Sequence, residues 1–309
     1  MRGILRWAFS KRTGVWTERL DIPCKEKPKE RNEPGEISVT FISHSTVLLQ
    51  QDGLNILTDP VYSNRVGPLS WLGIKRYRAP GICFLDLPPI DIVLISHDHY
   101  DHLDLPTLYD LEKVHQPLFV VGLGNAEWLR ERGLTHVVEL DWWQGLRLGD
   151  WIEIVGVPAQ HWSKRGLGDT RERLWVGFVM RGSHAQVYFA GDTGFGPHFE
   201  EIYEKFGPMR LALLPMGAYR PQWFMSYNHM NPREAVDAQL ILRAQTSVGI
   251  HFGTFPLGGE GQDDPQKAVQ AYLDLIPEPP QFIALDFGER LDLEIATDDR
   301  AKRDQQPSP

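Results

Sequence analysis

Cysteine is scarce in this chain: only Cys24 and Cys83 occur among 309 residues. Two cysteines this far apart cannot make the disulfide framework of a small secreted domain, and they do not form the Cys-x-x-Cys knuckle of many structural zinc sites. We therefore expect two ordinary thiols rather than a bridge. Hydrophobic residues make up 42% of the chain and aromatic residues 11%, which indicates a globular protein with an apolar core.

An excess of basic residues and a long apolar run are also missing. The formal net charge is −9, whereas a general nucleic-acid binder would carry a basic stripe. No apolar stretch approaches the roughly 20 residues that span a bilayer. The stretch 1–12 is basic, and its apolar patch is too short for a secretory signal. We expect a loosely packed arm there; the alternative is contact with a bilayer surface through Trp7, Phe9 and Trp16.

Hydrophobic periodicity divides the chain into an N-terminal arm (1–36), one large domain (37–292) and a charged tail (293–309) that we expect to be disordered. Strands are expected at 38–42, 47–50, 54–57, 91–95, 118–121, 136–140, as a longer pair around 146–157, at 175–180, 186–189, 210–214, 247–250 and, as the last strand, 281–285. Helices are expected at 106–114, 125–132, 232–245 and 265–275.

Turn and cap residues refine this pattern. Asp52-Gly53 between two apolar runs predicts a β-hairpin. Asn231 with Pro232 and Glu234 has the residue types of a helix N-cap with its first and third helical positions. The segment 63–89 has little regular pattern, and we expect a long functional loop there.

The most informative stretch is Ser96-His-Asp-His-Tyr-Asp-His102, with three histidines and two acids in seven positions. It directly follows the apolar run 91–95, a pattern typical of a buried strand that ends at a site. Two imidazoles at i and i+2 and an adjacent acid–imidazole pair offer enough nitrogen and oxygen ligands for two metal ions of the zinc type. A His-rich surface loop is the alternative, and it is disfavoured because matching residues follow other predicted strands.

Those matching residues are His161, Asp192 and His251, each near the end of a predicted strand. We predict two zinc ions per chain, with the two oxygens of Asp192 as a bridge. The first ion is held by His97, His99 and His161, and the second by Asp101, His102 and His251. A water shared by two such ions becomes a nucleophile near neutral pH, and Asp101 is also placed to orient it.

The order His-x-His-x-Asp-His, a lone His, a Gly-Asp and a final His resembles the metallo-β-lactamase superfamily. Within it, the chain is similar to the N-acylphosphatidylethanolamine-hydrolysing phospholipases D. The resembling segments, within about 38–290, are Leu57-Thr-Asp-Pro60, Ser96-His-Asp-His-Tyr-Asp-His-Leu-Asp104, Pro158-Ala-Gln-His-Trp162 and Phe189-Ala-Gly-Asp-Thr-Gly194. The most diagnostic are Gly217-Ala-Tyr-Arg-Pro-Gln-Trp-Phe-Met225, His229 and His251-Phe-Gly-Thr-Phe255.

This resemblance implies an α/β fold, the αββα four-layer sandwich, with two mixed β-sheets face to face, helices outside and metals at one sheet edge. It implies the same ligand roles. It also implies a zinc phosphodiesterase that cleaves a glycerophospholipid, such as N-acylphosphatidylethanolamine, to phosphatidic acid and an N-acylethanolamine. The chain departs from the pattern at Arg220, where the family has an acid, at Phe252, where it has Trp, and at Ser43-His44, where Gly-His is usual. These departures concern the lipid substrate rather than the metal ligands.

Several residues outside the ligand set are also assigned roles. His229 precedes a predicted helix N-terminus, which favours an anionic phosphate, so we expect it to contact phosphate or to protonate the leaving group. The alternative is a histidine that packs on Trp223. The substrate-binding residues are taken to be His44, Tyr219, Trp223, Phe224 and Met225. For His44 a hydrogen-bonding role is equally open, and for the Trp-Phe-Met wall core packing is equally open.

The remaining acids and histidines are given supporting roles. We expect Asp59 to be a buried carboxylate that supports the metal loop and Asp104 to be a helix N-cap. Surface or structural roles are expected for the histidines without matching neighbours, which are His115, His136, His184 and His198.

The leading hypothesis is therefore a binuclear zinc phosphodiesterase of the phospholipase D type, in lipid metabolism. The first alternative is a hydrolase of a small soluble ester, such as a lactonase, on the same scaffold. The second is a metal-binding protein without turnover. A redox di-iron role is disfavoured because such members carry Glu where this chain has His99. We expect a phospholipid or other phosphodiester substrate, no nucleic acid, a cytoplasmic location with peripheral membrane contact, and leave a homodimer open.

Overall fold

The computed structural model describes residues 14–20, 25, 27–33, 35–69, 71–149 and 152–293. Trp7, Phe9, Cys24 and the chain after residue 293 lie outside these ranges, so the expectations for them stay predictions. Among the described residues, the strands form two seven-stranded sheets and one separate two-stranded sheet.

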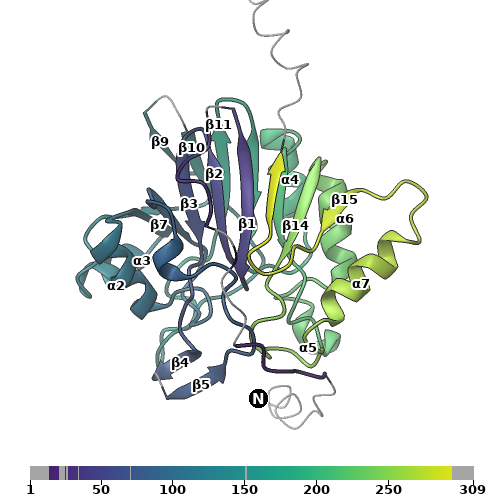
Figure 1. Ribbon diagram of the computed structural model, residues 1–309, viewed down its shortest axis with the longest axis horizontal. Coiled ribbons are helices and arrows are strands. Elements are labelled where there is room, and N and C mark those ends of the chain that lie inside the picture. Colours follow the sequence, from purple (N-terminus) through teal and green to yellow (C-terminus); the bar gives the residue numbers. More distant parts are fainter. Residues whose placement is uncertain are drawn as a thin grey trace, which may run out of the picture.

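The two large sheets lie face to face in the middle of the molecule (Figure 1). The first has the order β16-β1-β2-β3-β6-β7-β8, from β1 (Ile37–Ser43), β2 (Thr46–Gln51), β3 (Leu54–Thr58), β6 (Ile92–Ile95), β7 (Leu118–Gly122), β8 (Val137–Leu140) and β16 (Arg290–Leu293). The second has the order β15-β14-β13-β12-β11-β10-β9, from β9 (Gly145–Leu148), β10 (Ile152–Val157), β11 (Gly177–Gly182), β12 (Gln186–Phe189), β13 (Leu211–Pro215), β14 (Thr246–Ile250) and β15 (Gln281–Ile283). Both sheets mix parallel and antiparallel pairs.

Helices cover the outer face of each sheet (Figure 1). The first sheet is flanked by α2 (Leu105–Val114) and α3 (Asn125–Arg130), and the second by α4 (His198–Phe206), α6 (Pro232–Leu242) and α7 (Asp264–Leu273). A short helix, α5 (Gln222–Met225), follows β13. This arrangement is the αββα sandwich with two mixed sheets, so the predicted fold class is confirmed.

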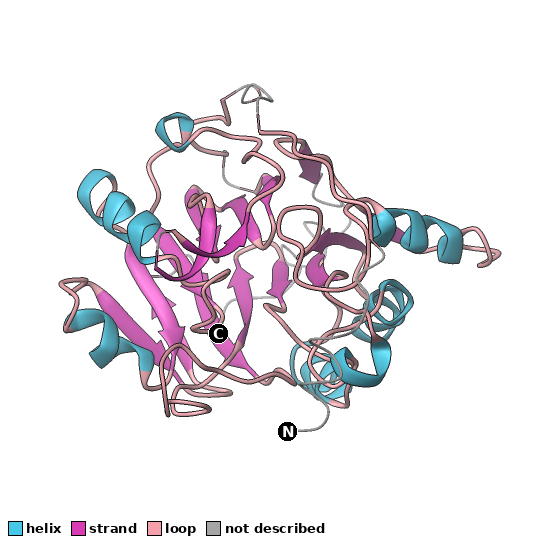
Figure 2. Cartoon of the chain, turned by 90° about the horizontal axis from the view of Figure 1, so that it is seen from below, coloured by secondary structure: helices cyan, strands magenta, loops and turns pink. Residues whose placement is uncertain are grey.

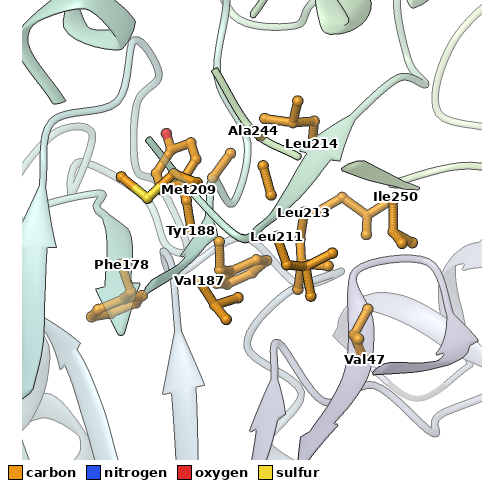
Figure 3. Close-up of a cluster of buried hydrophobic side chains, with 14 of the residues drawn as sticks. Val47, Phe178, Val187, Tyr188, Met209, Leu211, Leu213, Leu214, Ala244 and Ile250 are labelled. Atoms are coloured by element: carbon orange, nitrogen blue, oxygen red, sulfur yellow. The ribbon is translucent and has the colours of Figure 1, made fainter. Parts of the chain in front are cut away.

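The main apolar core lies between the sheets and continues beneath the helices of the second sheet. Val47 from β2 and Phe178, Leu213 and Ile250 from the second sheet belong to it, and none is exposed to solvent (Figure 3). All five residues of β13 are buried, because a strand in the middle of a sandwich is covered on both faces. Its sequence therefore reads as a continuous apolar run rather than an alternating one.

The strands that precede the predicted site residues all end at one edge of the sandwich. In the first sheet, β1 and β3 both pair antiparallel with β2, and β6 runs parallel to β3. In the second, β10 and β12 both pair antiparallel with β11, and β13 and β14 run parallel to β12. We call this edge, with its loops, the ligand edge. Figure 2 looks onto it from below.

The predicted β2–β3 hairpin is confirmed. Gln51 and Leu54 are paired across the turn, and the two residues between them, Asp52 and Gly53, have φ values of 51° and 77°. Positive φ at both central residues is the type I′ geometry, which matches the twist of the flanking strands.

Two expectations about secondary structure are wrong. The segment 63–89 is not structureless, because it contains the hairpin β4 (Arg65–Leu69) and β5 (Leu72–Lys75) and a 3₁₀-helix at Phe84–Asp86. A register shift between Val66 and Leu69 interrupts the alternation that would have indicated these strands. The strand at β15 is not the last one, because β16 returns to pair with β1. Helices α4 and α5 were not anticipated.

The expectation of an ordinary thiol is wrong for Cys83, which is disulfide-bonded. Cysteine spacing alone carries no information on which residues a fold brings together. The arm is also less loose than expected where it is described. The Trp16 indole donates to the Glu260 carbonyl at 3.0 Å and packs against Tyr77, and Arg19 pairs with Asp263 at 3.0 Å. Trp16 therefore belongs to the folded domain.

Within the described ranges, no helix combines the length and the apolar character needed to cross a membrane.

The cap of α6 provides a stability test next to the functional region. Asn231 accepts from the Glu234 amide at 3.0 Å, and the Glu234 carboxylate accepts from the Asn231 amide at 2.8 Å. We expect Asn231→Ala to lower the free energy of unfolding by about 1 kcal/mol, because the Glu234 amide loses its side-chain acceptor. Asn231→Asp keeps the acceptor and should change it little. Urea denaturation of both variants checks this, and equal losses would contradict a capping role.

Candidate metal centre

Three imidazoles converge at the ligand edge. His97 and His99 follow β6, and His161 follows β10. The Nε2 of His97 lies 2.8 Å from the Nδ1 of His99, and the Nε2 of His161 lies 3.2 Å from that same nitrogen. Nitrogens bound to one tetrahedral zinc ion at about 2.0–2.1 Å lie roughly 3.3 Å apart. The spacing is therefore close to that of a three-histidine metal site.

A second group gathers beside the first. Asp101 Oδ2 lies 3.3 Å from His102 Nε2 and 3.5 Å from His251 Nε2. His44 approaches the same oxygen with its Nε2 at 3.0 Å, and its side chain is 1% exposed. The structure thus places His44 behind Asp101, where it can also complete a ligand group with Asp101, His102 and His251.

Asp192 lies between the two groups. Its Oδ2 is 3.2 Å from His102 Nε2 and 3.1 Å from His251 Nε2. The same oxygen is 3.9 Å from His97 Nε2 and 3.8 Å from His161 Nε2. A carboxylate in this place can bridge two cations. The fold brings all seven predicted ligands together.

The backbone at the ligand edge is held in unusual conformations. His44, Asp59 and His251 have φ values of 53°, 33° and 61°, in the left-handed region that costs a non-glycine residue energy. Gly191, before Asp192, has φ 61°, and a Cβ there would lie 2.5 Å from the Cβ of Ser96. Only glycine allows the Asp192 loop to lie this close to the loop of the His97 group.

Asp59 holds ligands of both groups from behind. Its Oδ1 accepts from the Ser96 amide at 2.7 Å, and its Oδ2 lies 2.6 Å from both the Ser96 hydroxyl and His102 Nδ1. The Ser96 hydroxyl in turn lies 2.9 Å from His97 Nδ1. Such contacts fix the ring orientation of a ligating imidazole and raise its basicity. This is the supporting carboxylate that the sequence predicted.

Charges within the centre compensate one another. Burial alone would raise the pKa of Asp101 and Asp192, but neighbouring imidazoles outweigh it and hold both well below their usual range. Burial opposes the cation of His102, but Asp192, Asp101 and Asp59 raise its pKa well above the ordinary value. In the same way, Asp192 and Asp101 raise the pKa of His251 to about 9 against the effect of burial. The two acids are therefore anionic at neutral pH.

The His97 group behaves differently. Burial, followed by the neighbouring imidazoles, lowers the pKa of His97 well below its ordinary value, and burial does the same for His161. Neutral imidazoles are the form that binds metal ions. His161 donates from Nδ1 to the Asn228 carbonyl at 3.0 Å, which leaves its Nε2 free to act as a ligand.

The donor atoms of this centre fit a metal of the zinc type. His99 Nε2 and Asp192 Oδ1 are buried and lack a hydrogen-bond partner among the described residues. A buried polar atom without a partner costs about 1–3 kcal/mol, and coordination would remove that cost. Mixed imidazole and carboxylate ligands without thiolates suit zinc and similar divalent ions.

The other predicted site residues differ in burial and in their distance from the ligand groups. His229 Nδ1 lies 3.7 Å from Asp192 Oδ2, and the His229 ring lies 5.1 Å from that of His161. Trp223 is half-exposed, whereas Met225 is buried, so the proposed acyl wall is divided between surface and core. Tyr219 is buried, and its hydroxyl has no hydrogen-bond partner among the described residues.

Asp104 is the N-cap residue of α2, as expected, but its side chain makes no capping bond to the helix amides. Its carboxylate instead accepts from the Ser63 amide at 3.1 Å and hydroxyl at 2.8 Å, and from the Thr107 hydroxyl at 2.5 Å. It therefore ties the segment before β4 to the start of α2.

Two contacts of the centre escaped the sequence analysis. Ser96 was seen only as the first residue of the motif, although its position between an apolar run and His97 could have indicated a partner for that ring. Asn228 acts through its main-chain carbonyl, for which side-chain chemistry gives no signal.

A pocket of about 710 Å³ lies next to the centre, on the side of α2 and α3. Tyr100, which stands between the ligands His99 and Asp101, forms part of its wall. Trp128, Arg132 and Arg165 line it as well. The pocket wall therefore combines aromatic and cationic side chains, and one of them, Tyr100, belongs to the loop that carries the candidate ligands.

Comparison with known proteins gives a family match over much of the chain. Residues 54–252 match the family described as "Beta-lactamase superfamily domain". The chain is 39% identical over 265 residues to N-acyl-phosphatidylethanolamine-hydrolyzing phospholipase D 1 of Caenorhabditis elegans, covering 81% of this chain and 74% of that protein. It is 36% identical over 261 residues to the mitochondrial N-acyl-phosphatidylethanolamine-hydrolyzing phospholipase D of Saccharomyces cerevisiae, covering 82% of this chain but 55% of the yeast protein.

Among solved structures, Igni18, a metallo hydrolase of the archaeon Ignicoccus hospitalis, is similar with a TM-score of 0.65 and 22% identity. The likeness covers 84% of this chain and 100% of that one. At this identity the likeness concerns the fold alone.

Asp59 provides a test of the centre. We expect Asp59→Asn to weaken metal binding about 10–100-fold, because an amide cannot serve as acceptor for both Ser96 and His102. Competition with a chromophoric chelator measures this. Asp91→Asn, at the opposite end of β6 and bonded to Arg31 and the Asn55 amide, is the matched control and should bind metal normally. Unchanged affinity in Asp59→Asn would show that the carboxylate does not organise the ligands.

Proposed function

This chain belongs to the β-lactamase superfamily, and from that premise we propose that it is a zinc-dependent phosphodiesterase that hydrolyses a glycerophospholipid. The membership and the ligand groups support a metal-dependent hydrolase. The observation that carries the lipid substrate is a rim of exposed apolar side chains around the same ligand edge. The 39% identity to a phospholipase of C. elegans agrees with it.

Two zinc ions would be held by the residues described above, with His97, His99 and His161 on one side and Asp101, His102 and His251 on the other. When bound, they supply a Lewis acid for a phosphoryl oxygen and lower the pKa of a coordinated water. Asp192 keeps the two groups at a fixed separation. Asp101 is anionic and receives a hydrogen bond from His44, so its carboxylate is held in one orientation and can accept a proton from an attacking water.

His229 is the candidate for contact with the phosphoryl group. Burial lowers its pKa to about 4, so the ring is neutral at neutral pH. A neutral imidazole donates one hydrogen bond without adding charge, which favours a contact to a phosphoryl oxygen over protonation of the leaving group. Its side chain is 13% exposed, and it stands one turn before α6, whose N-terminus also favours an anion.

The apolar rim consists of exposed side chains on segments at the ligand edge. Its members are Val15, Leu69, Trp71, Leu72, Leu167, Trp223 and Tyr227. Trp71 connects β4 to β5 and is 71% exposed, and Trp223 on α5 is 50% exposed. Figure 1 shows β4 and β5 at the lower left of this end of the molecule and α5 at its lower right. Large aromatic groups around a polar centre suit contact with a bilayer interface, where one end of the side chain is apolar and the other wet.

The substrate test compares two phosphodiesters with the zinc-loaded protein. We expect N-acylphosphatidylethanolamine in mixed micelles to be hydrolysed at least about tenfold faster than a short soluble phosphodiester, which corresponds to roughly 1.4 kcal/mol from lipid contact. Trp71→Ala should weaken binding to phospholipid vesicles and leave hydrolysis of the soluble diester unchanged. Leu240→Ala, an exposed apolar residue on α6 away from the rim, is the control. Equal rates on both substrates, or faster cleavage of an acyl lactone, would contradict the lipid assignment.

His229 gives a separate test of the chemistry. We expect His229→Ala to retain two zinc ions per chain and to lower kcat about 10²-fold or more, as loss of one oriented donor to a developing anion does. His184→Ala, an exposed histidine on a turn far from the ligand edge, should behave as the unaltered protein. Elemental analysis and kinetics together decide the matter. Loss of metal would make His229 a ligand, which its grouping with His161 and Asp192 permits, and an unchanged rate would leave it a packing residue.

A further inference from the structure

A buried ion pair between Asp98 and Arg173 joins the ligand loop to a neighbouring segment. Asp98 stands between the ligands His97 and His99, and its side chain is not exposed at all. Its Oδ2 accepts from Arg173 Nε at 2.7 Å, and its Oδ1 accepts from the Lys164 amide at 2.8 Å. Asp98 therefore has no free oxygen for a metal ion, although it lies within the motif.

Arg173 is itself held on several sides. Its Nη2 donates to the Asp169 carboxylate, its main-chain carbonyl accepts from the Ser163 hydroxyl at 2.5 Å, and its guanidinium lies 5.6 Å from the ring centre of Trp128. The Arg173 side chain is 9% exposed. Two buried opposite charges thus join the ligand loop to the segment 163–173, which follows His161.

Arg165 closes the ligand loop. Its Nη1 donates to the Asp98 carbonyl at 2.9 Å and to the Leu103 carbonyl at 2.7 Å. These two carbonyls bracket the segment that bears His99, Asp101 and His102. The guanidinium also lies 4.3 Å from the ring centre of Tyr100, whose hydroxyl donates to the Arg165 carbonyl at 2.6 Å.

We propose that Asp98, Arg165 and Arg173 form a clamp that positions the ligand loop 97–102 for metal binding. They are positioning residues. Both oxygens of Asp98 are occupied by the Lys164 amide and Arg173, and a cationic guanidinium does not bind a metal ion. The proposal rests on the metal-binding part of the proposed function and not on the lipid substrate, so the micelle assay can fail while the clamp stands.

Physical reasons favour a clamp over a pair that serves stability alone. A buried ion pair contributes little net stability compared with apolar residues of the same volume, because both charges lose their hydration. It does impose a defined geometry, since a guanidinium donates in fixed directions within one plane. A metal site needs its ligands held within about 0.5 Å, and the carbonyls bonded by Arg165 are one residue from His99 and one from His102.

The test separates positioning from stability with a double-variant cycle. Asp98→Asn leaves Arg173 with Asp169 as its one remaining carboxylate, and Arg173→Met leaves the buried Asp98 without a cation. Both variants should therefore lower the melting temperature and weaken zinc binding about 10–100-fold. The double variant removes both charges, and we expect its melting temperature, measured on chelator-treated protein, to return toward that of the unaltered chain. Its zinc affinity should stay at least about tenfold weaker, because the loop is no longer held in one geometry.

The Arg31–Asp91 pair is the matched control. It is a two-contact pair at 2.6 and 2.9 Å before the start of β6, at the opposite end of the strand from the ligand loop. The double variant Asp91→Asn, Arg31→Met should leave zinc affinity unchanged. Cobalt substitution gives a second readout, because the d–d absorption of the bound ion reports ligand geometry directly.

Two results would overturn the clamp. Recovery of zinc affinity together with melting temperature in the Asp98, Arg173 double variant would make the pair a stabilising contact only. Wild-type zinc affinity and cobalt spectrum in the single variants and in Arg165→Met would show that the ligand loop holds its geometry without the clamp. Failure of the unaltered chain to bind zinc at all would instead remove the proposed function.

Discussion

Mutual neutralisation of buried imidazoles and carboxylates at the ligand edge is the interaction on which the rest of the structure depends. Asp59, Asp101 and Asp192 are each buried or nearly so, and a lone carboxylate there would cost several kcal/mol. The charges of Asp101 and Asp192 are tolerated because His102 and His251 lie within 3.5 Å of them and carry raised pKa values. At Asp59 burial outweighs the contact with His102 and raises the pKa of the carboxyl group. Metal ions would take the place of those protons, so metal affinity and pH are linked in this centre. An arrangement of this kind tolerates little displacement of any strand end.

The two sheets meet that requirement jointly. The His97 group takes two residues from a loop of the first sheet and one from the second, and the other group is divided in the same way. The sandwich must therefore form before either group is complete. Strained residues such as His44 and His251 can persist because the apolar core around β1 and β14 determines where their strands end. Asp59 then holds the ligand loop through Ser96 and His102, and the clamp holds it through Asp98. These contacts explain why polar groups without a chemical role of their own are buried next to the centre.

Chemistry and substrate are separable in this molecule. The ligand groups fit a metal-dependent hydrolase, but one fold can host many functions, so the fold alone does not set the substrate. What distinguishes this chain lies around the centre: the apolar rim, the β4–β5 hairpin with Trp71, and the pocket beside Tyr100. These elements come from the segment 63–89 and from loops after the ligands. They can vary without disturbing the core, as loops on a rigid scaffold generally do.

The sequence by itself determined the class of fold and pointed to the seven residues that the fold gathers at the ligand edge. The residue types that can bind a metal ion are visible in the sequence itself, and a motif such as His97–His102 at the end of an apolar run can be recognised from a few neighbouring residues. The same holds for the Asp52-Gly53 turn and the Asn231 cap, where the signal spans a few residues. Tertiary structure alone decided that β16 pairs with β1, that Cys83 is disulfide-bonded, that His44 reaches Asp101 and that Arg165 and Arg173 hold the loop. Each of these depends on contacts between residues far apart in the chain, and pairing at such distances follows from how strands stack rather than from any local preference.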